Sequence, residues 1–344
     1  MNSDQEQQAN NTPYAPNVAR QKAYLQLLLL LLITVVSFII ALTSGSLSLS
    51  FLEVFSAISS DANPLHHQVV YELRVPRMIH AFTTGALLAL AGALMQVLLR
   101  NPLADPYILG ISGGSAVFAL IAIALGLVGW TVSLSAFFGA LLAMFLVFGL
   151  ARGQGSWTAT RLLLTGVVLA SGWGAIVSFV LTIAPQGKLR SLIFWLMGDL
   201  SFAENFWPSL ITLALGILVC LYFARSLNVL SLGAMQAQSL GLHINRFRWQ
   251  LYVVASLLTA MAIIQAGNIG FIGLIIPHLL RLLGLRDYRL LIPGAVLAGG
   301  SLLVFADTFA RSAIDDTALP VGILTAAIGV PIFIFLLYRG VKSL

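Results

Sequence analysis

Charged side chains are scarce in this sequence, because Asp, Glu, Lys and Arg make up only 9% of its 344 residues while 59% are hydrophobic. Soluble domains carry about 25% charged residues. The 18 basic and 12 acidic side chains are too few to cover a protein of this size in water, which excludes a soluble enzyme. Cysteine is nearly absent too, and the single Cys220 excludes an internal disulfide bond and a cysteine-rich metal site.

Three functional signatures are missing as well. No G-x-x-x-x-G-K-[ST] phosphate-binding loop occurs, so any ATP that drives this protein is expected to bind to another subunit. The five histidines show no H-E-x-x-H or similar metal-ligand spacing, and we expect the chain to hold no metal or other cofactor of its own. The basic residues sit singly between apolar runs and form no patch for nucleic acid.

Long apolar runs dominate what is present. The first, Leu25 to Leu42, exceeds the core of a signal peptide, which is about 7–15 residues long, and is interpreted as an uncleaved first span. A transmembrane helix needs about 20 apolar residues. The pattern predicts an all-α polytopic membrane protein with ten spans, the eighth being the least certain because it is short and contains Pro277 and Arg281. The other nine runs lie at about 78–99, 107–129, 131–150, 161–183, 207–224, 250–267, 271–285, 291–309 and 320–338.

The charges of the loops predict the orientation. Residues 1–23 are polar and rich in Gln and Asn, and are expected to form a disordered cytoplasmic tail before one transmembrane domain, 24–344. With the N-terminus inside, 13 of the 18 basic residues lie on the inner side, as the positive-inside rule requires. Ten spans then place both termini in the cytoplasm. The five outer basic residues are Arg74, Arg77, Lys188, Arg190 and Arg311.

Two connecting segments do not resemble ordinary loops. Residues 226–249 lie on the inner side, where Gly233 and Gly241 would divide the segment into one or two short helices with an apolar face. A solvated connector needs no such face, so a surface for a cytoplasmic partner is favoured. Residues 184–206 form an outer piece too short to span, which we expect to lie at the interface or to re-enter. The face on the inner segment comprises Leu230, Leu232, Met235, Leu240 and Leu242.

Two other classes of protein remain as alternatives. Residues 110–114 match the G-x-S-x-G pattern with Ser112 as nucleophile and His278 as candidate base, which would indicate an intramembrane serine hydrolase. That motif requires a strand–turn–helix context, whereas small residues in a helical run are explained by close packing. An ion-coupled secondary transporter would use a charge inside a span, and Asp307 is the best candidate. Arg311, four residues later on the same helical face, favours a local ion pair instead.

Several strings of the sequence, in order, resemble one family: the ten-helix permease subunit of ABC importers for ferric siderophores, haem and vitamin B12. Arg-x-Pro-Arg followed by Gln-x(4)-Asn-Pro-Leu-Ala-x-Pro is a specific signature of it. The matching strings are ELRVPRMIHAFTTGALLALAGALMQVLLRNPLADPYILGISGGSA (72–116), TRLLLTGVVL (160–169), FWLMGDLS (194–201), LSLGAMQAQSLGL (230–242), GNIGFIGLIIPHLLRLLG (267–284), PGAVLAGGSLLVFADTFAR (293–311) and PVGILTAAIGVPIFIFLLYR (320–339).

The resemblance implies a homodimer in the bacterial inner membrane, with the translocation path along the dimer axis. It also implies two cytoplasmic ATPase subunits, which bind ATP and Mg, and a periplasmic substrate-binding protein on the outer face. The ligand stays open between a ferric siderophore, haem and cobalamin. Asp199 stands where many relatives carry Ser or Gly, and the resemblance assigns no ligand to this difference.

The resemblance also implies roles for individual residues. Arg74, Arg77 and Arg311 would dock the binding protein by gripping carboxylates, the alternative being that they are interfacial anchors. The apolar face on residues 226–249, together with Gly241, would couple to the ATPase. Ala159 and Thr160 would form a cytoplasmic gate, the alternative being an ordinary helix N-terminus capped by a threonine.

Overall fold

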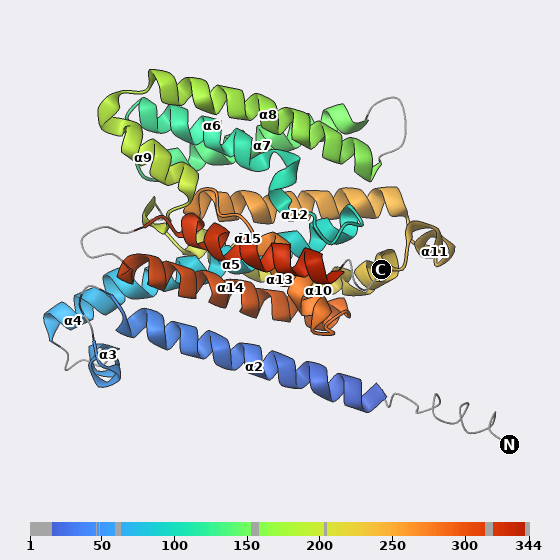
Figure 1. Ribbon diagram of the computed structural model, residues 1–344, viewed down its shortest axis with the longest axis horizontal. Coiled ribbons are helices and arrows are strands. Elements are labelled where there is room, and N and C mark those ends of the chain that lie inside the picture. The colour runs from blue at the N-terminus through green and yellow to red at the C-terminus, as the bar shows by residue number, and fades with distance from the viewer. Residues whose placement is uncertain are drawn as a thin grey trace.

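The computed structural model describes residues 16–45, 47, 49–58, 63–152, 158–202, 205–313 and 319–340, and every regular element in these ranges is a helix. Figure 1 shows long helices lying side by side in one bundle. The elements are α2 (Pro16–Thr43), α3 (Phe51–Ile58), α4 (Pro64–Gln68), the π-helix η1 (Val69–Arg74), α5 (Val75–Leu98), the 3-10 turn η2 (Pro106–Leu109), α6 (Ile111–Ala124), α7 (Trp130–Arg152), α8 (Ala159–Ile183), α9 (Gln186–Met197), the 3-10 turn η3 (Leu200–Phe202), α10 (Trp207–Ser231), α11 (Ala234–Ser239), α12 (Ile244–Ala266), α13 (Ile272–Leu282), α14 (Tyr288–Ser312) and α15 (Val321–Gly340).

Each of the ten apolar runs in the sequence corresponds to one helix, which confirms the polytopic all-α fold. By length and composition, seven of the described helices could cross a membrane, namely those containing α2, α5, α7, α8, α10, α12 and α14. The apolar helices of α6, α13 and α15 are shorter. The start of α2, the end of α15 and helix α11 lie at one end of the bundle, and α3, α4 and α9 lie at the other (Figure 1). This arrangement agrees with an even number of spans.

The first helix starts earlier than the apolar run indicates. Helix α2 begins at Pro16, so residues 16–23 of the predicted polar tail are helical. The apolar run marks only the part of a helix that faces lipid or protein. Gln21, Lys22 and Ala23 are good helix formers, and they extend the helix beyond that part.

Helix α5 is the centre of the bundle. Every residue from Thr83 to Leu99 is buried, because α10, α12, α13 and α14 all pack against this helix. By contrast, α2 and α8 are largely exposed on the described chain. A helix surrounded by other helices needs few large side chains that face lipid, and the Ala and Gly residues of α5 allow close packing against its neighbours.

Glycines set the distance between α5 and two of its neighbours. A Cβ on Gly85 would lie 2.2 Å from the carbonyl oxygen of Gly299 in α14. A Cβ on Gly92 would lie 1.8 Å from the carbonyl oxygen of Gly273 in α13. The obstacle in both places is backbone, which cannot move aside as a side chain can, so any larger residue would push the helices apart.

Two of the spans are broken, and the breaks meet beside α5. The eighth span is only partly helical: residues 267–271 are irregular, with positive φ at Gly267 and Phe271, and α13 provides a helix of 11 residues, about 16 Å long. The third span begins with η2, and its Tyr107 hydroxyl accepts a hydrogen bond from the backbone N–H of Ile269 at 3.3 Å. Irregular backbone at membrane depth is tolerated where protein surrounds it. The uncertain eighth run is therefore a helix of 11 residues preceded by irregular backbone, and its crossing of the membrane stays a prediction.

The close approach of α5 and α13 predicts that Gly92→Ala is strongly destabilising, by about 1–3 kcal/mol or more, because the new methyl group overlaps backbone. The matched control is Gly149→Ala in α7, where no heavy atom lies within 4 Å of the new Cβ. That change should leave stability unchanged or raise it by up to about 1 kcal/mol through helix propensity. Thermal unfolding of the purified chain in detergent compares the two, and equal midpoints would contradict the close approach.

Candidate functional site

A buried carboxylate joins two arginines at the end of the bundle opposite α11. The Asp307 side chain, in α14, is 2% exposed and lies 2.9 Å from Nη2 of Arg77 in α5. The Nε of Arg77 also donates to both carboxylate oxygens of Asp307, at 3.1 Å each. Arg311, one turn later in α14, donates from its Nε to the same carboxylate at 3.2 Å. The ion pair between Asp307 and Arg311 expected from their spacing is confirmed.

A second carboxylate extends this cluster to the connection between α9 and η3. Asp199 lies 3.9 Å from Nη2 of Arg77, and its Oδ1 accepts hydrogen bonds from the backbone N–H and hydroxyl of Ser201. Ser201 in turn accepts a hydrogen bond from Nη1 of Arg77 at 3.2 Å. Arg77 therefore ties α5 to both α14 and the segment after α9, and Asp199 has a structural partner.

Arg74 is placed differently from the other two outer arginines. It is 4% exposed, and its guanidinium donates to the backbone carbonyls of Leu42 and Leu47. The side chains of Arg77 and Arg311 are 21% and 17% exposed. In this conformation Arg74 holds the connection after α2 and faces inward, whereas the other two reach the surface.

The inner connecting segment is shorter than 226–249, because α10 continues to Ser231 and α12 begins at Ile244. It contains one short helix, α11. Leu230 is 1% exposed and belongs to the core, so the predicted apolar face loses this member. The reason is that Leu230 lies on the packed side of α10, which the apolar pattern could not separate from the free segment. Leu232, Met235 and Leu240 are 63%, 86% and 65% exposed and form the face, beside the half-buried Leu242.

The two glycines of this segment differ in their constraints. Both have positive φ, +129° at Gly233 and +85° at Gly241, where L side chains are strained. A Cβ on Gly233 would also meet the Gln236 side chain at 2.1 Å, while no heavy atom lies within 4 Å of a Cβ on Gly241. The turn before α11 is therefore more restricted than the turn after it.

The predicted gate lies at the start of α8. Thr158 is the N-cap, and its hydroxyl accepts a hydrogen bond from the backbone N–H of Arg161 at 3.2 Å. Ala159 is the first helical residue, and Thr160 is exposed. The capping that the alternative interpretation expected is present, and the role of these residues as a gate stays a prediction.

One side of α8 is exposed and carries hydroxyl groups, a feature that the sequence analysis did not identify. Thr160, Ser171, Ser178 and Thr182 are all exposed, and at 100° per residue they fall on one side of the helix. Gly172 and Gly174 have no heavy atom within 4 Å of an added Cβ. These two glycines do not pack against another described helix. The regular spacing of small hydroxyl residues was the available signal. We call the four hydroxyl residues the α8 stripe.

The serine hydrolase interpretation has no structural support. Ser112 lies in the first turn of α6, directly after the 3-10 turn η2 and not after a strand. The strand–turn–helix context of a nucleophile elbow is therefore missing there. Among the described residues, no group of three or more His, Cys, Asp or Glu side chains could hold a metal ion.

Comparison with known proteins identifies the family. The model of the FecCD transport family matches residues 32–339. The chain belongs to the FecCD transport family. It is therefore a multi-pass membrane permease and not an enzyme, which confirms the family and the function expected from the sequence.

Individual relatives support this membership. The chain is 41% identical over 275 residues to the vitamin B12 import system permease protein BtuC of Klebsiella pneumoniae, covering 78% of this chain and 82% of that protein. It is 39% identical over 294 residues to BtuC of Vibrio vulnificus, covering 84% and 87% of the two chains. The fold resembles a solved inward-facing conformation of a metal-chelate type ABC transporter, with a TM-score of 0.80, 34% identity and coverage of 91% and 98%.

A more distant solved structure shares the fold alone. The PsaBC structure from Streptococcus pneumoniae in complex with Fab matches with a TM-score of 0.54 and 17% identity, covering 82% of this chain and 95% of that chain. The helical arrangement of the FecCD chain thus extends to a protein with little sequence similarity.

The shared carboxylate predicts that Asp307→Asn destabilises the protein by about 3–5 kcal/mol, because Arg77 and Arg311 then lose their common partner. Adding Arg77→Gln to this variant should recover part of the loss. The control is Glu72→Gln, since exposed Glu72 accepts only a side-chain hydrogen bond from Gln68 among the described residues. Unfolding midpoints in detergent measure all three, and an Asp307→Asn midpoint equal to that of the control would refute the network.

Proposed function

We propose that this chain is the permease subunit of an ATP-driven importer for vitamin B12 or a related metal chelate in the bacterial inner membrane. The observation that carries the proposal is the similarity, over about four fifths of both chains, to proteins named vitamin B12 import system permeases. The solved metal-chelate type transporter supports the same class of cargo. A ferric siderophore, haem and cobalamin are all members of that class.

The proposed assembly is a homodimer with two ATPase subunits, which carry ATP and Mg, and one substrate-binding protein. The α8 stripe supports the dimer. The hydroxyls of Ser171, Ser178 and Thr182 donate back to helix carbonyls, as Ser178 does to Gly174 at 3.0 Å, yet these side chains are exposed on the described chain and nothing lies within 4 Å of a Cβ added at Gly172 or Gly174. A second copy facing this side would enclose a path lined by hydroxyl residues together with the exposed Leu164 and Val167, with Ala159 and Thr160 at its inner mouth.

The face of Leu232, Met235 and Leu240, together with Gly241 and Leu242, is proposed to dock on the ATPase. Exposed apolar side chains of this size in water favour a partner surface. Leu230 supports this face from the core. Since α11 directly follows α10, movement of the ATPase would reach the membrane helices through the turn at Gly233.

Arg77 and Arg311 are proposed to dock the binding protein at the opposite end. Both pair with Asp307, and Arg77 also contacts Asp199 and Ser201, but their side chains stay partly exposed, so a carboxylate of the binding protein can add a further pair. Arg74 can join them only by giving up its bonds to the carbonyls after α2.

The test of this function is uptake. In a bacterial strain without its own B12 permease, the chain with its ATPase and binding protein should restore uptake of radiolabelled cyanocobalamin or, failing that, of a ferric chelate. Met235→Asp should lower uptake by about tenfold or more, because a charge replaces a buried interface contact. The control is Leu125→Asp at the other end of the bundle, where the leucine is 76% exposed against 86% for Met235. Restoration of neither uptake would refute the proposal.

The dimer has a separate test by disulfide crosslinking. Cys220, the single native cysteine, is 0% exposed. Cys220→Ser removes it, so that each cysteine introduced afterwards is the only one in the chain. Ser171→Cys, Ser178→Cys and Thr160→Cys should each crosslink two copies of the chain in membranes, whereas Leu218→Cys on the exposed side of α10 should not. Crosslinking of the α10 control alone would place the interface elsewhere.

A further inference from the structure

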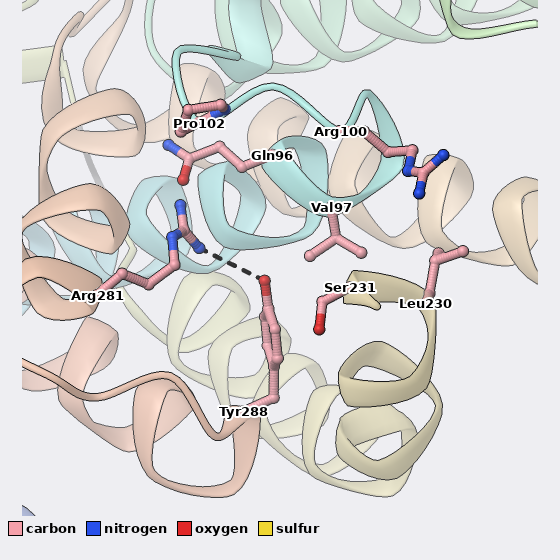
Figure 2. Close-up of a pocket in the computed structure, with 8 residues that line it drawn as sticks. All are labelled: Gln96, Val97, Arg100, Pro102, Leu230, Ser231, Arg281 and Tyr288. Atoms are coloured by element: carbon pink, nitrogen blue, oxygen red, sulfur yellow. Dashed lines mark hydrogen bonds between the residues drawn. The ribbon is translucent and has the colours of Figure 1, made fainter. Parts of the chain in front are cut away.

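A cavity of about 580 Å³ opens at the inner end of the bundle, between the ends of α5, α10 and α13 and the start of α14. Figure 2 shows side chains from all four helices around it. The proposed transport path does not use this cavity, which shares only Leu230 with the residues proposed to serve the ATPase surface. Its lining residues are Gln96, Val97, Arg100, Pro102, Leu230, Ser231, Arg281 and Tyr288.

The cavity is basic, and the described residues that line it include no acidic side chain. Arg281 donates from Nη1 to the Tyr288 hydroxyl at 3.4 Å, and its buried Nη2 has no hydrogen-bond partner in the described part of the chain. The carboxylate of Asp287, next in sequence to Tyr288, accepts hydrogen bonds from the Asn228 side chain and from the backbone N–H of Arg289. The helix C-termini around the cavity favour positive charge, but they leave the N–H donor of Arg281 unsatisfied.

Arg100 reaches this cavity from an unfavourable backbone conformation. Its φ is +52°, and it occupies the position after α5 where glycine is usual. The hydrogen bonds of Arg100 N to Val97 O and of Asn101 N to Gln96 O close the α5 terminus in the Schellman pattern. A non-glycine residue there costs about 1–2 kcal/mol, and strain of this kind clusters at functional sites.

Gln96 and Tyr288 add two groups of opposite type. The Gln96 amide nitrogen donates to the carbonyl of Leu274 at 3.0 Å, which fixes the amide, and its buried Oε1 has no hydrogen-bond partner among the residues that the structure describes. Figure 2 shows this oxygen and the Arg281 guanidinium turned toward one another. Because the Tyr288 oxygen accepts from Arg281, its own proton is available to a ligand. The site thus offers donors at Arg281 and Tyr288 and one acceptor at Gln96.

We propose that this cavity binds a phosphate that carries a proton, as inorganic phosphate or as a phosphomonoester. The unprotonated oxygens would accept hydrogen bonds from Arg281 and Tyr288, since arginine is suited to phosphate. The P–OH group would donate to Gln96 Oε1, and Arg100 would attract the anion at the mouth. Sulfate and phosphodiesters have no such proton at neutral pH, so the Gln96 oxygen disfavours them.

The experiment measures equilibrium binding of radiolabelled inorganic phosphate to the full chain in phosphatidylcholine nanodiscs. We expect saturable binding that sulfate competes for at least about tenfold more weakly. Arg281→Gln should weaken binding about tenfold or more, and Tyr288→Phe about threefold to tenfold. Arg286→Gln, which removes the same charge from an exposed neighbour outside the lining, should change the affinity less than twofold.

Two added lipids distinguish the sources of the phosphate. Displacement of the label by phosphatidic acid, a phosphomonoester, but not by phosphatidylglycerol, a phosphodiester, would assign the cavity to a lipid headgroup. Displacement by neither would assign it to soluble phosphate. Equal displacement by both lipids, equal competition by sulfate, an equal loss in Arg286→Gln, or no saturable binding would each overturn the proposal. Tyr288→Phe keeps the packing of the ring, so the test does not depend on Arg281→Gln being folded.

Discussion

The distance between α5 and its neighbours is the constraint on which the rest of the structure depends. Gly85 and Gly92 bring the backbone of α5 against Gly299 and Gly273 of two later helices. This approach buries α5 from Thr83 to its end and fixes where its two ends lie. Arg77 at one end then meets Asp307, and Gln96 at the other meets the carbonyl of Leu274. Polar contacts at both ends are possible only because the middle is held at close range.

The two ends of α5 are stabilised by different chemistry. At the outer end a carboxylate of α14 pairs with arginines, so the charges there are nearly balanced inside the chain. At the inner end, Arg100 and Arg281 line a cavity without any acidic side chain. The outer end, where the charges are balanced, is suited to hold the helices rigidly, while the exposed parts of Arg77 and Arg311 can still contact a partner. The unbalanced end is suited to an anion from outside the chain.

Much of the fold could be predicted from the sequence, because long apolar runs report membrane helices directly. The ten runs, the positive-inside asymmetry and the pair of Asp307 with Arg311 all follow from local spacing. Leu230 and the irregular residues 267–271 could not be assigned from the sequence, since burial inside a membrane protein depends on which neighbour covers a residue, and an apolar side chain can be covered by protein or face lipid. The partners of Arg74 and the α8 stripe required the three-dimensional arrangement, because they are set by residues distant in sequence or by a surface without a described neighbour.

The central position of α5 has a consequence for the order of synthesis. Arg77 and Asp307 are 230 residues apart, so α5 leaves the ribosome long before α12, α13 and α14 exist to cover it. Until then the buried polar groups of α5, such as Gln96 and Thr84, face lipid, water or the insertion machinery. The early helices can insert one by one, but the bundle can close only when the last third of the chain has been made. A chain truncated before α12 would leave α5 without the helices that cover it, and quality-control proteases would be expected to degrade such a chain.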